Sequence, residues 1–257
     1  MVSSMRRRGT IKLVLLVLSG IGLGCAAYQA IMFVRVARLR SENPTSTSLM
    51  LARTQETQAQ GEQPVHEQLW VPLDRISTNL QRAVLAGEDT NFATHHGFDY
   101  EAIQKAWERA QQEAQKEAKK EGEEEPGWFP DTSAFRRGGS TVSQQLAKNL
   151  YLSSQRSFLR KGQEAVLTIF LERMLSKRRI LELYLNVIEW GDGIYGAEAA
   201  SRHYFHKPAA ALSVNEAAFL SAMIPNPRTV FNPQVNPRRV ARRQRIILRG
   251  MPYVKLP

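Results

Sequence analysis

Cysteine, strand-like alternation and internal repeats are all scarce in this chain. The single cysteine, Cys25, excludes an intrachain disulfide framework. Few segments alternate apolar with polar residues and no repeat is present, so the pattern does not favour a large sheet or a repeat architecture. Hydrophobic residues make up 43% of the 257 residues, which is enough for a core and excludes disorder throughout the chain.

Acidic residues are also in deficit. The chain has 24 Asp and Glu against 35 Lys and Arg, which gives a formal net charge of +11. Such an excess indicates an anionic partner: nucleic acid, a phospholipid surface or a phosphorylated substrate. The sign of the charge does not choose among them.

Charged residues are absent from Leu13 to Val34. A helix of this length, rising about 1.5 Å per residue, can cross a hydrocarbon core of about 30 Å. A transmembrane helix over 13–34 is therefore preferred to a cleaved signal, whose apolar region is shorter, and to a lipoprotein signal at Cys25. We interpret residues 1–12 as a cytoplasmic tail and 35–68 as a polar stalk. Basic residues flank the span on both sides, so charge alone does not fix its orientation.

The remainder, 69–257, is predicted to be one mainly α domain. Asp99 is expected to cap a helix that is followed by a charged, mobile insertion at about 108–135. A basic amphipathic helix is expected after the proline-rich stretch that ends at Pro237. Apolar residues recur at helical spacing, between Gly, Pro and Asn, over 141–152, 160–186, 193–205 and 213–223.

The first of two unusual polar segments begins with Glu88 and Asp89 and runs to Gly97. Glu88 follows an apolar run, so its carboxylate could come from a packed helix end into a cleft, with the raised pKa of a general base. The plainer alternative is an ordinary acid at a helix end. A metal site at His95 and His96 is disfavoured, because their spacing matches no tight zinc pattern.

The second polar segment covers 138–149. Thr141 and Gln144 fit a capping box, so part of it is explained as the start of a helix. Capping does not explain why Gln145 and Lys148 share the same helix face, where a buried lysine beside amides needs an anion. The next helix opens with basic residues around Glu164. On its own, that group would be an ordinary surface ion-pair ladder.

Taken together, these segments resemble the peptidoglycan glycosyltransferase family, glycosyltransferase family 51, across about residues 75–233. No Ser-x-x-Lys with a later Lys-Thr-Gly is present, so no penicillin-binding transpeptidase domain is expected in this sequence, and the monofunctional biosynthetic transglycosylases fit best. The resemblance implies a lysozyme-like helical domain behind a single N-terminal transmembrane helix. Five blocks agree in order: Glu88-Asp89, Phe92 and His95/His96-Gly97; Gly139-Ser140-Thr141, Gln144-Gln145 and Lys148-Asn149; Arg160-Lys161, Glu164 and Glu172; Lys177, Ile180-Leu181-Glu182, Tyr184-Leu185-Asn186, Gly191, Gly196, Ala199 and Tyr204-Phe205; and Glu216-Ala217, Leu220 and Pro225.

The resemblance implies that lipid II is polymerised by inverting β-1,4 transfer with release of undecaprenyl pyrophosphate. Glu88 would be the base, and Glu164 a second catalytic carboxylate held among cations. No obligatory cofactor is implied, although a divalent cation, Mg²⁺ or Mn²⁺, could bridge the pyrophosphate. The substrate-binding residues would be Asp89, Phe92, Ser140, Thr141, Gln144, Gln145, Lys148, Asn149, Arg156, Arg160 and Lys161.

The implied partners are lipid II, the growing glycan strand and the membrane, with penicillin-binding and divisome proteins as further candidates and no nucleic acid. The implied location is the bacterial inner membrane, with a single span and a periplasmic catalytic domain. Two other interpretations stay open: a lysozyme-like muramidase or lytic transglycosylase, and a non-catalytic membrane scaffold of the wall-synthesis complex.

Overall fold

The computed structural model describes residues 2–105, 107–108, 111–112, 140–153 and 157–257. Arg156 and Gly139, and most of the expected insertion at 108–135, lie outside the described residues. The predicted cap is confirmed, because Asp99 Oδ1 accepts a hydrogen bond of 2.9 Å from the amide of Ala102.

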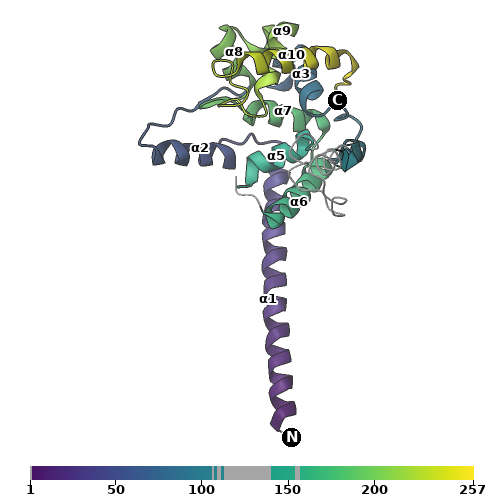
Figure 1. Cartoon of the computed structure of the whole chain (residues 1–257). Helices are drawn as coiled ribbons and strands as arrows, with labels where there is room; N and C mark the ends of the chain where they lie inside the picture. The colour runs from purple at the N-terminus through teal and green to yellow at the C-terminus, as the bar shows by residue number, and fades with distance from the viewer. Residues whose placement is uncertain (1, 106, 109–110, 113–139, 154–156) are drawn as a thin grey trace, which may run out of the picture.

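The first helix, α1 (Val2–Arg38), extends away from the rest of the molecule, as Figure 1 shows. Its segment Leu15–Arg38 is long and apolar enough to cross a membrane. Near its C-terminal end α1 packs on α6 (Phe158–Met174), where Val36 is fully buried and the ring of Phe33 meets that of Phe170 edge-on at 5.4 Å. The apolar helix is therefore continuous up to the domain, and its C-terminal end packs against it.

The segment expected to be a stalk contains a helix, α2 (Ser48–Ala59), which packs against α5 (Val142–Tyr151). Thr47 caps α2 by accepting a hydrogen bond from the amide of Met50, and Met50 itself is buried. Little of the helix is apolar, which is why its sequence showed no clear periodicity. This helix is part of the domain surface beside the candidate site.

The domain consists of two groups of helices (Figure 1). In one, α3 (Thr78–Glu88) packs on α9 (Val214–Met223) and α10 (Pro237–Gly250). In the other, α5 packs on α6 and on α7 (Lys177–Val187). The single helix expected over 160–186 is wrong: Leu175 is extended, and Ser176 caps α7 by accepting from the amide of Arg179. Both helices bury apolar residues in the same core, so the spacing of apolar residues continues from α6 into α7 and does not reveal the end of the first helix.

A small sheet and, among the described residues, three short 3₁₀ turns complete the domain. β1 (Glu67–Gln68) runs parallel to β3 (Ile194–Tyr195), which pairs antiparallel with β2 (Glu189–Gly191). The expected helix over 193–205 begins later, as α8 (Ala197–Phe205), because the strands occupy its predicted start. Gly196 precedes α8 with φ 83°, and a Cβ there would lie 2.8 Å from the carbonyl oxygen of Asn186. The 3₁₀ turns are η1 (Leu73–Arg75), η3 (Ala209–Ala211) and η4 (Met251–Tyr253).

Candidate active site

Glu88 is the last residue of α3, whose buried face includes Leu80, Val84 and Leu85. Packing of that face carries the carboxylate into the domain, where its side chain is only 9% exposed. Arg243 Nη2 donates to Glu88 Oε1 at 2.7 Å. Burial raises the pKa of Glu88, as predicted, and the charge of Arg243 is the largest opposing effect.

The second donor to Glu88 is Gln145 Nε2 on α5, at 2.8 Å from Oε2. The amide of Gln145 is oriented by Tyr184, whose hydroxyl donates to Gln145 Oε1 at 2.9 Å. Burial, reinforced by the negative charges of Glu88 and Asp89, holds the pKa of Tyr184 well above its usual value. Tyr184 therefore remains a donor, and Gln145 must present its NH₂ group to Glu88.

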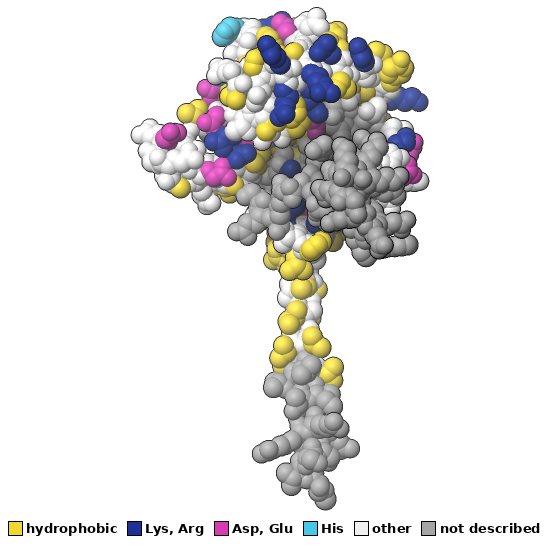
Figure 2. Space-filling model, in the orientation of Figure 1, with side chains coloured by type: hydrophobic (Ala, Val, Ile, Leu, Met, Phe, Trp, Pro, Cys, Tyr) yellow, Lys and Arg dark blue, Asp and Glu magenta, His cyan; other side chains and the backbone are white. Residues whose placement is uncertain are grey.

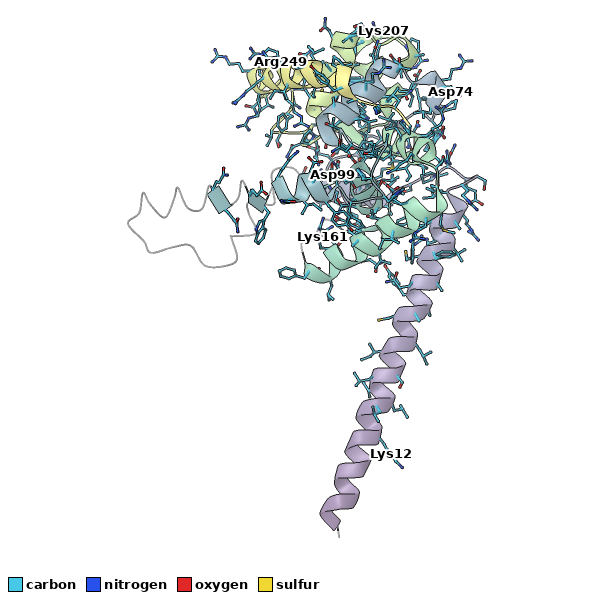
Figure 3. The ribbon with its side chains drawn as sticks, turned by 90° about the vertical axis from the view of Figure 1, so that its right-hand side faces the viewer. Lys12, Asp74, Asp99, Lys161, Lys207 and Arg249 are labelled. Atoms are coloured by element: carbon cyan, nitrogen blue, oxygen red, sulfur yellow. The ribbon has the colours of Figure 1, made fainter. Side chains whose placement is uncertain are left out.

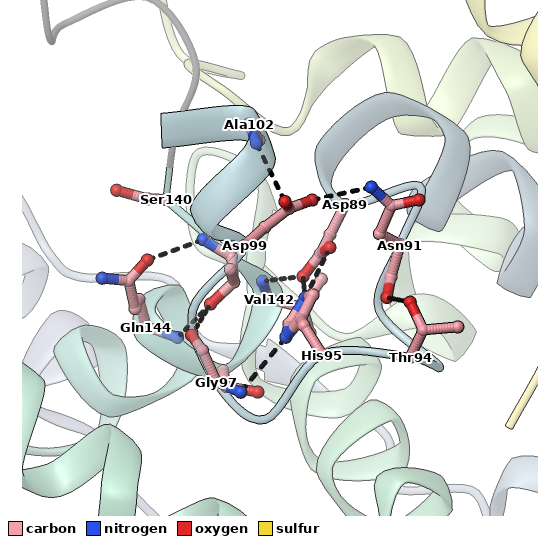
Figure 4. A network of polar contacts seen from close by, with 12 residues as sticks. Asp89, Asn91, Thr94, His95, Gly97, Asp99, Ala102, Ser140, Val142 and Gln144 are labelled. Atoms are coloured by element: carbon pink, nitrogen blue, oxygen red, sulfur yellow. Dashed lines mark hydrogen bonds and ion pairs between the residues drawn. The ribbon is translucent and has the colours of Figure 1, made fainter. Parts of the chain in front are cut away.

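Asp89 ties the two polar segments together, as Figure 4 shows. Its Oδ2 accepts from the amide of Val142, in the first turn of α5, at 2.9 Å. His95 Nε2 lies 2.9 and 3.0 Å from the two carboxylate oxygens of Asp89. His95 Nδ1 accepts from the amide of Gly97, so this network assigns the ring proton to Nε2. Asp89 thus places a negative charge at a helix N-terminus, where it is favourable.

The capping box predicted at Thr141 and Gln144 is confirmed. Thr141 also donates from Oγ1 to the carbonyl oxygen of Gly97 at 2.7 Å. The side chains of Thr141 and Gln144 are both buried. Phe92 is fully buried too, with Lys177 Nζ 4.4 Å from its ring centroid. These three residues hold the two polar segments in place, and their predicted contact with substrate stays a prediction.

A pocket of about 460 Å³ lies next to Gln145. Lys148, Asn149 and Arg160 line one side of it, and α2 contributes Arg53 on the other. Within the part of the chain that the structure describes, Lys148 makes no hydrogen bond or ion pair. Burial lowers its pKa, and the negative charge of Glu164 opposes this. An ammonium group that lines a pocket without a partner fits an anionic ligand.

Glu164 lies beneath this cationic side and is 4% exposed. Arg160 Nη1 donates to its Oε2 at 2.9 Å, and Lys161 Nζ donates to its other oxygen. The group is therefore a partly buried cluster in which three cations, counting Lys148, surround one acid. Ser140 lies at the edge of this region and is exposed, and its carbonyl accepts from Gln145 Nε2 at 3.4 Å.

Sequence reasoning missed three residues around the pocket and Glu88: Tyr184, Arg243 and Arg53. Tyr184 and Arg243 act on Glu88 as described above. Arg53 donates from Nη2 to Glu189 Oε2 at 3.0 Å, at the α2 side of the pocket. Tyr184 belongs to one of the five blocks, so the sequence did carry a signal for it. Arg243 is one of several arginines in a basic helix, and nothing in the sequence distinguishes it from the others. Arg53 was not considered because residues 35–68 were interpreted as a stalk.

A buried carboxylate beside a cationic pocket, in a mainly helical domain behind an apolar helix, is the arrangement expected of an enzyme that transfers glycosyl groups. The family model "Transglycosylase" matches residues 54–122 and 129–252. The chain therefore belongs to the transglycosylase family, as its five blocks predicted.

Relatives cover nearly the whole chain. A biosynthetic peptidoglycan transglycosylase of Thiobacillus denitrificans is 48% identical over 230 residues, which is 90% of each chain. One of Laribacter hongkongensis is 44% identical over 233 residues, covering 90% of this chain and 92% of the relative. One of Aromatoleum aromaticum is 43% identical over 257 residues, the full length of both chains.

Proposed function

We propose that this peptidoglycan glycosyltransferase builds cell-wall glycan strands by polymerising lipid II, with Glu88 as the general base. Glu88 removes the proton from the 4-hydroxyl of the acceptor sugar. The resulting oxygen nucleophile attacks the anomeric carbon of the donor, and the bond from that carbon to the lipid pyrophosphate breaks with inversion. The observation that carries this assignment is a buried carboxylate whose pKa is raised and whose two oxygens accept from Arg243 and Gln145.

The leaving pyrophosphate needs positive charge rather than a proton. Lys148, Arg160 and Lys161 supply it. Glu164 pairs with Arg160 and Lys161, and Lys148 is buried at the pocket, so the positive charge is in place before any substrate binds. Glu164 accepts hydrogen bonds from two cations, which suits positioning them and argues against work as a general acid. We expect Arg156, Asn149 and Ser140 to add contacts to the same substrate.

A divalent ion is not required by this scheme. Among the described residues, no group of three His, Cys, Asp or Glu side chains could hold a metal. Both oxygens of Glu164 already accept hydrogen bonds from cations. Any Mg²⁺ or Mn²⁺ would therefore be held mainly by the pyrophosphate oxygens of the substrate. Polymerisation that continues in EDTA would agree with a reaction that needs no divalent ion. Loss of polymerisation in EDTA that Mg²⁺ restores would show that the ion is required.

The substrate carries a lipid, so the cleft must lie near the bilayer. Phe158 and Leu159, at the start of α6, are 90% and 89% exposed. Lys161 in the same turn lies at the α1 side of the domain, as Figure 3 shows. We propose that these two apolar side chains enter the outer face of the inner membrane, with the domain in the periplasm. A Phe158→Ser, Leu159→Ser variant should lose activity on lipid II in vesicles, and equal activity would refute the contact.

The central experiment incubates purified, detergent-solubilised enzyme with labelled lipid II and resolves the products by gel electrophoresis before and after muramidase digestion. Glu88→Gln should lower polymerisation by about 10²- to 10⁴-fold. Glu62→Gln, which changes an exposed carboxylate, should not. Full activity of a folded Glu88→Gln enzyme would remove Glu88 as the base.

The same preparation tests the alternatives. A raised pKa at Glu88 is also what a general acid needs, so a lytic enzyme is the second candidate. Release of soluble muropeptides from purified sacculi would favour it. No polymer and no muropeptides from folded protein would favour the scaffold.

A further inference from the structure

The positive charge of the chain is concentrated on α10. This helix carries six arginines and no acidic residue. Arg243 is turned inward, where it donates to Glu88. The remaining five, Arg238, Arg239, Arg242, Arg245 and Arg249, are exposed.

Four of these form a single line, which we call the arginine stripe: Arg238, Arg242, Arg245 and Arg249. Their spacing of four, three and four residues places them on one face of a helix. The opposite face carries Val240 and Ile247, which are buried against the domain. Across the described residues, no stripe arginine has an ion pair or a side-chain hydrogen bond, and like charges four apart repel. Such a stripe is tolerated at the surface, and it is well suited to an anion that neutralises it.

The position of the stripe argues against a phospholipid surface. In Figure 1, α10 lies at the end of the domain opposite to α1, and Figure 3 places Arg249 at the end far from Lys12. Figure 2 shows dark blue side chains gathered over this distal part of the molecule. A domain anchored through α1 therefore presents the stripe away from its own membrane.

The stripe lies on the same helix as Arg243, the residue that reaches the proposed base. Arg242 is the neighbour of Arg243, which reaches Glu88 at 2.7 Å. From its first to its last arginine the stripe spans 12 residues, which is about 16 Å along the helix. A polymer that leaves the vicinity of Glu88 along α10 would meet one guanidinium group per turn.

We propose that the arginine stripe binds carboxylates on the stem peptides of the nascent glycan strand. This proposal rests on the proposed function, which supplies a product with peptide carboxylates repeating along it. Guanidinium groups pair with carboxylates through two parallel hydrogen bonds, so a row of arginines matches a repeating carboxylate better than a neutral sugar chain. Several weak contacts on one strand add to a lasting attachment.

Binding is tested by co-sedimentation of the full-length, detergent-solubilised protein with purified sacculi. Arg242→Gln, Arg245→Gln should weaken binding by about fivefold, the effect of losing two exposed ion pairs. The matched control, Arg173→Gln, Arg178→Gln, removes the same charge from exposed positions outside α10 and should bind like the wild type. Sacculi whose carboxylates have been amidated with carbodiimide should bind the wild type as poorly as the stripe variant binds native sacculi.

Three results would overturn the proposal: unchanged binding of the stripe variant, an equal loss in the control, or full binding to amidated sacculi. If the stripe variant binds sacculi like the wild type but binds phosphatidylglycerol vesicles more weakly, the stripe is a lipid-binding site instead. Glu88→Gln protein should still bind sacculi, so failure of catalysis and failure of the stripe are separable. With labelled lipid II, the stripe variant should form its first bond at the wild-type rate but release shorter strands, and strands of wild-type length would contradict the role in retention.

Discussion

Arg243 offers the sharpest test of the site, because it reaches Glu88 from the far end of the chain. Its Nη2 donates to Glu88 Oε1 at 2.7 Å and to the carbonyl of Gly87 at 2.9 Å. The side chain is 25% exposed and that of Glu88 9%, so water screens the pair only partly. A hydrogen bond to a charged group of this kind contributes about 1.5–3 kcal/mol, which favours the ionised form of the carboxylate.

The expected effect of Arg243→Gln is on the acid side of the pH profile. Burial raises the pKa of Glu88 and Arg243 lowers it, so removing Arg243 raises it further. A base must be ionised, and activity is therefore lost at a higher pH than in the wild type. On that acid limb, the loss of about 1.5–3 kcal/mol corresponds to a fall in rate of about 10- to 150-fold.

The assay is kcat/KM for lipid II against pH, which reports ionisation in the free enzyme. Arg242→Gln is the matched control, because it removes the same charge from the next residue, whose side chain is exposed. The reasoning fails if the acid limb of Arg243→Gln coincides with that of the wild type, or if Arg242→Gln moves it equally. A thermal unfolding curve for each variant separates this effect from loss of fold.

Three further changes test neighbouring parts of the site. Lys148→Gln should lower kcat by about 10²- to 10³-fold and leave urea unfolding almost unchanged, because Lys148 has no partner among the described residues; an unchanged kcat would exclude it from leaving-group stabilisation. Tyr184→Phe should lower the free energy of unfolding by about 1–3 kcal/mol and reduce kcat, because Gln145 Oε1 loses its donor and the amide group can rotate. If neither the free energy of unfolding nor kcat changes, Tyr184 does not orient Gln145. Arg53→Gln should cost about 2 kcal/mol by leaving Glu189 buried without its cation. Burial raises the pKa of Glu189, so the contribution of this residue to stability is fully present below its pKa in the unfolded chain and is lost as the pH rises through its pKa in the folded protein. The destabilisation by Arg53→Gln, measured by urea unfolding, should therefore be larger at about pH 8 than at about pH 5. The reverse order would refute the argument.

Local patterns were enough to predict much of this molecule. The long apolar helix follows from an uncharged run, whose length and apolarity suffice to cross a bilayer. The capping box at Thr141 and the cap at Asp99 depend on residues three apart, so they were visible in the sequence and are confirmed. The five blocks predicted the family, because each is a short run of residues and their order along the chain is itself a property of the sequence.

Other features depend on how the helices pack. The break at Ser176 was missed because α6 and α7 both present apolar residues to one core, which keeps the pattern continuous across the turn. The helix α2 was missed because it is held by a few contacts with α5 rather than by an apolar stripe of its own.

The sequence determined the chemical groups available to this enzyme, their order, and the helices that carry them, because these depend on residues close in the chain. Only the tertiary structure decided which groups surround Glu88. Gln145 is 57 residues away from it and Arg243 is 155 residues away, and nothing local links these positions. Packing of α3 against α10, and the orientation of Gln145 by Tyr184, bring both donors to one carboxylate. The charge and protonation of that carboxylate are therefore properties of the folded domain.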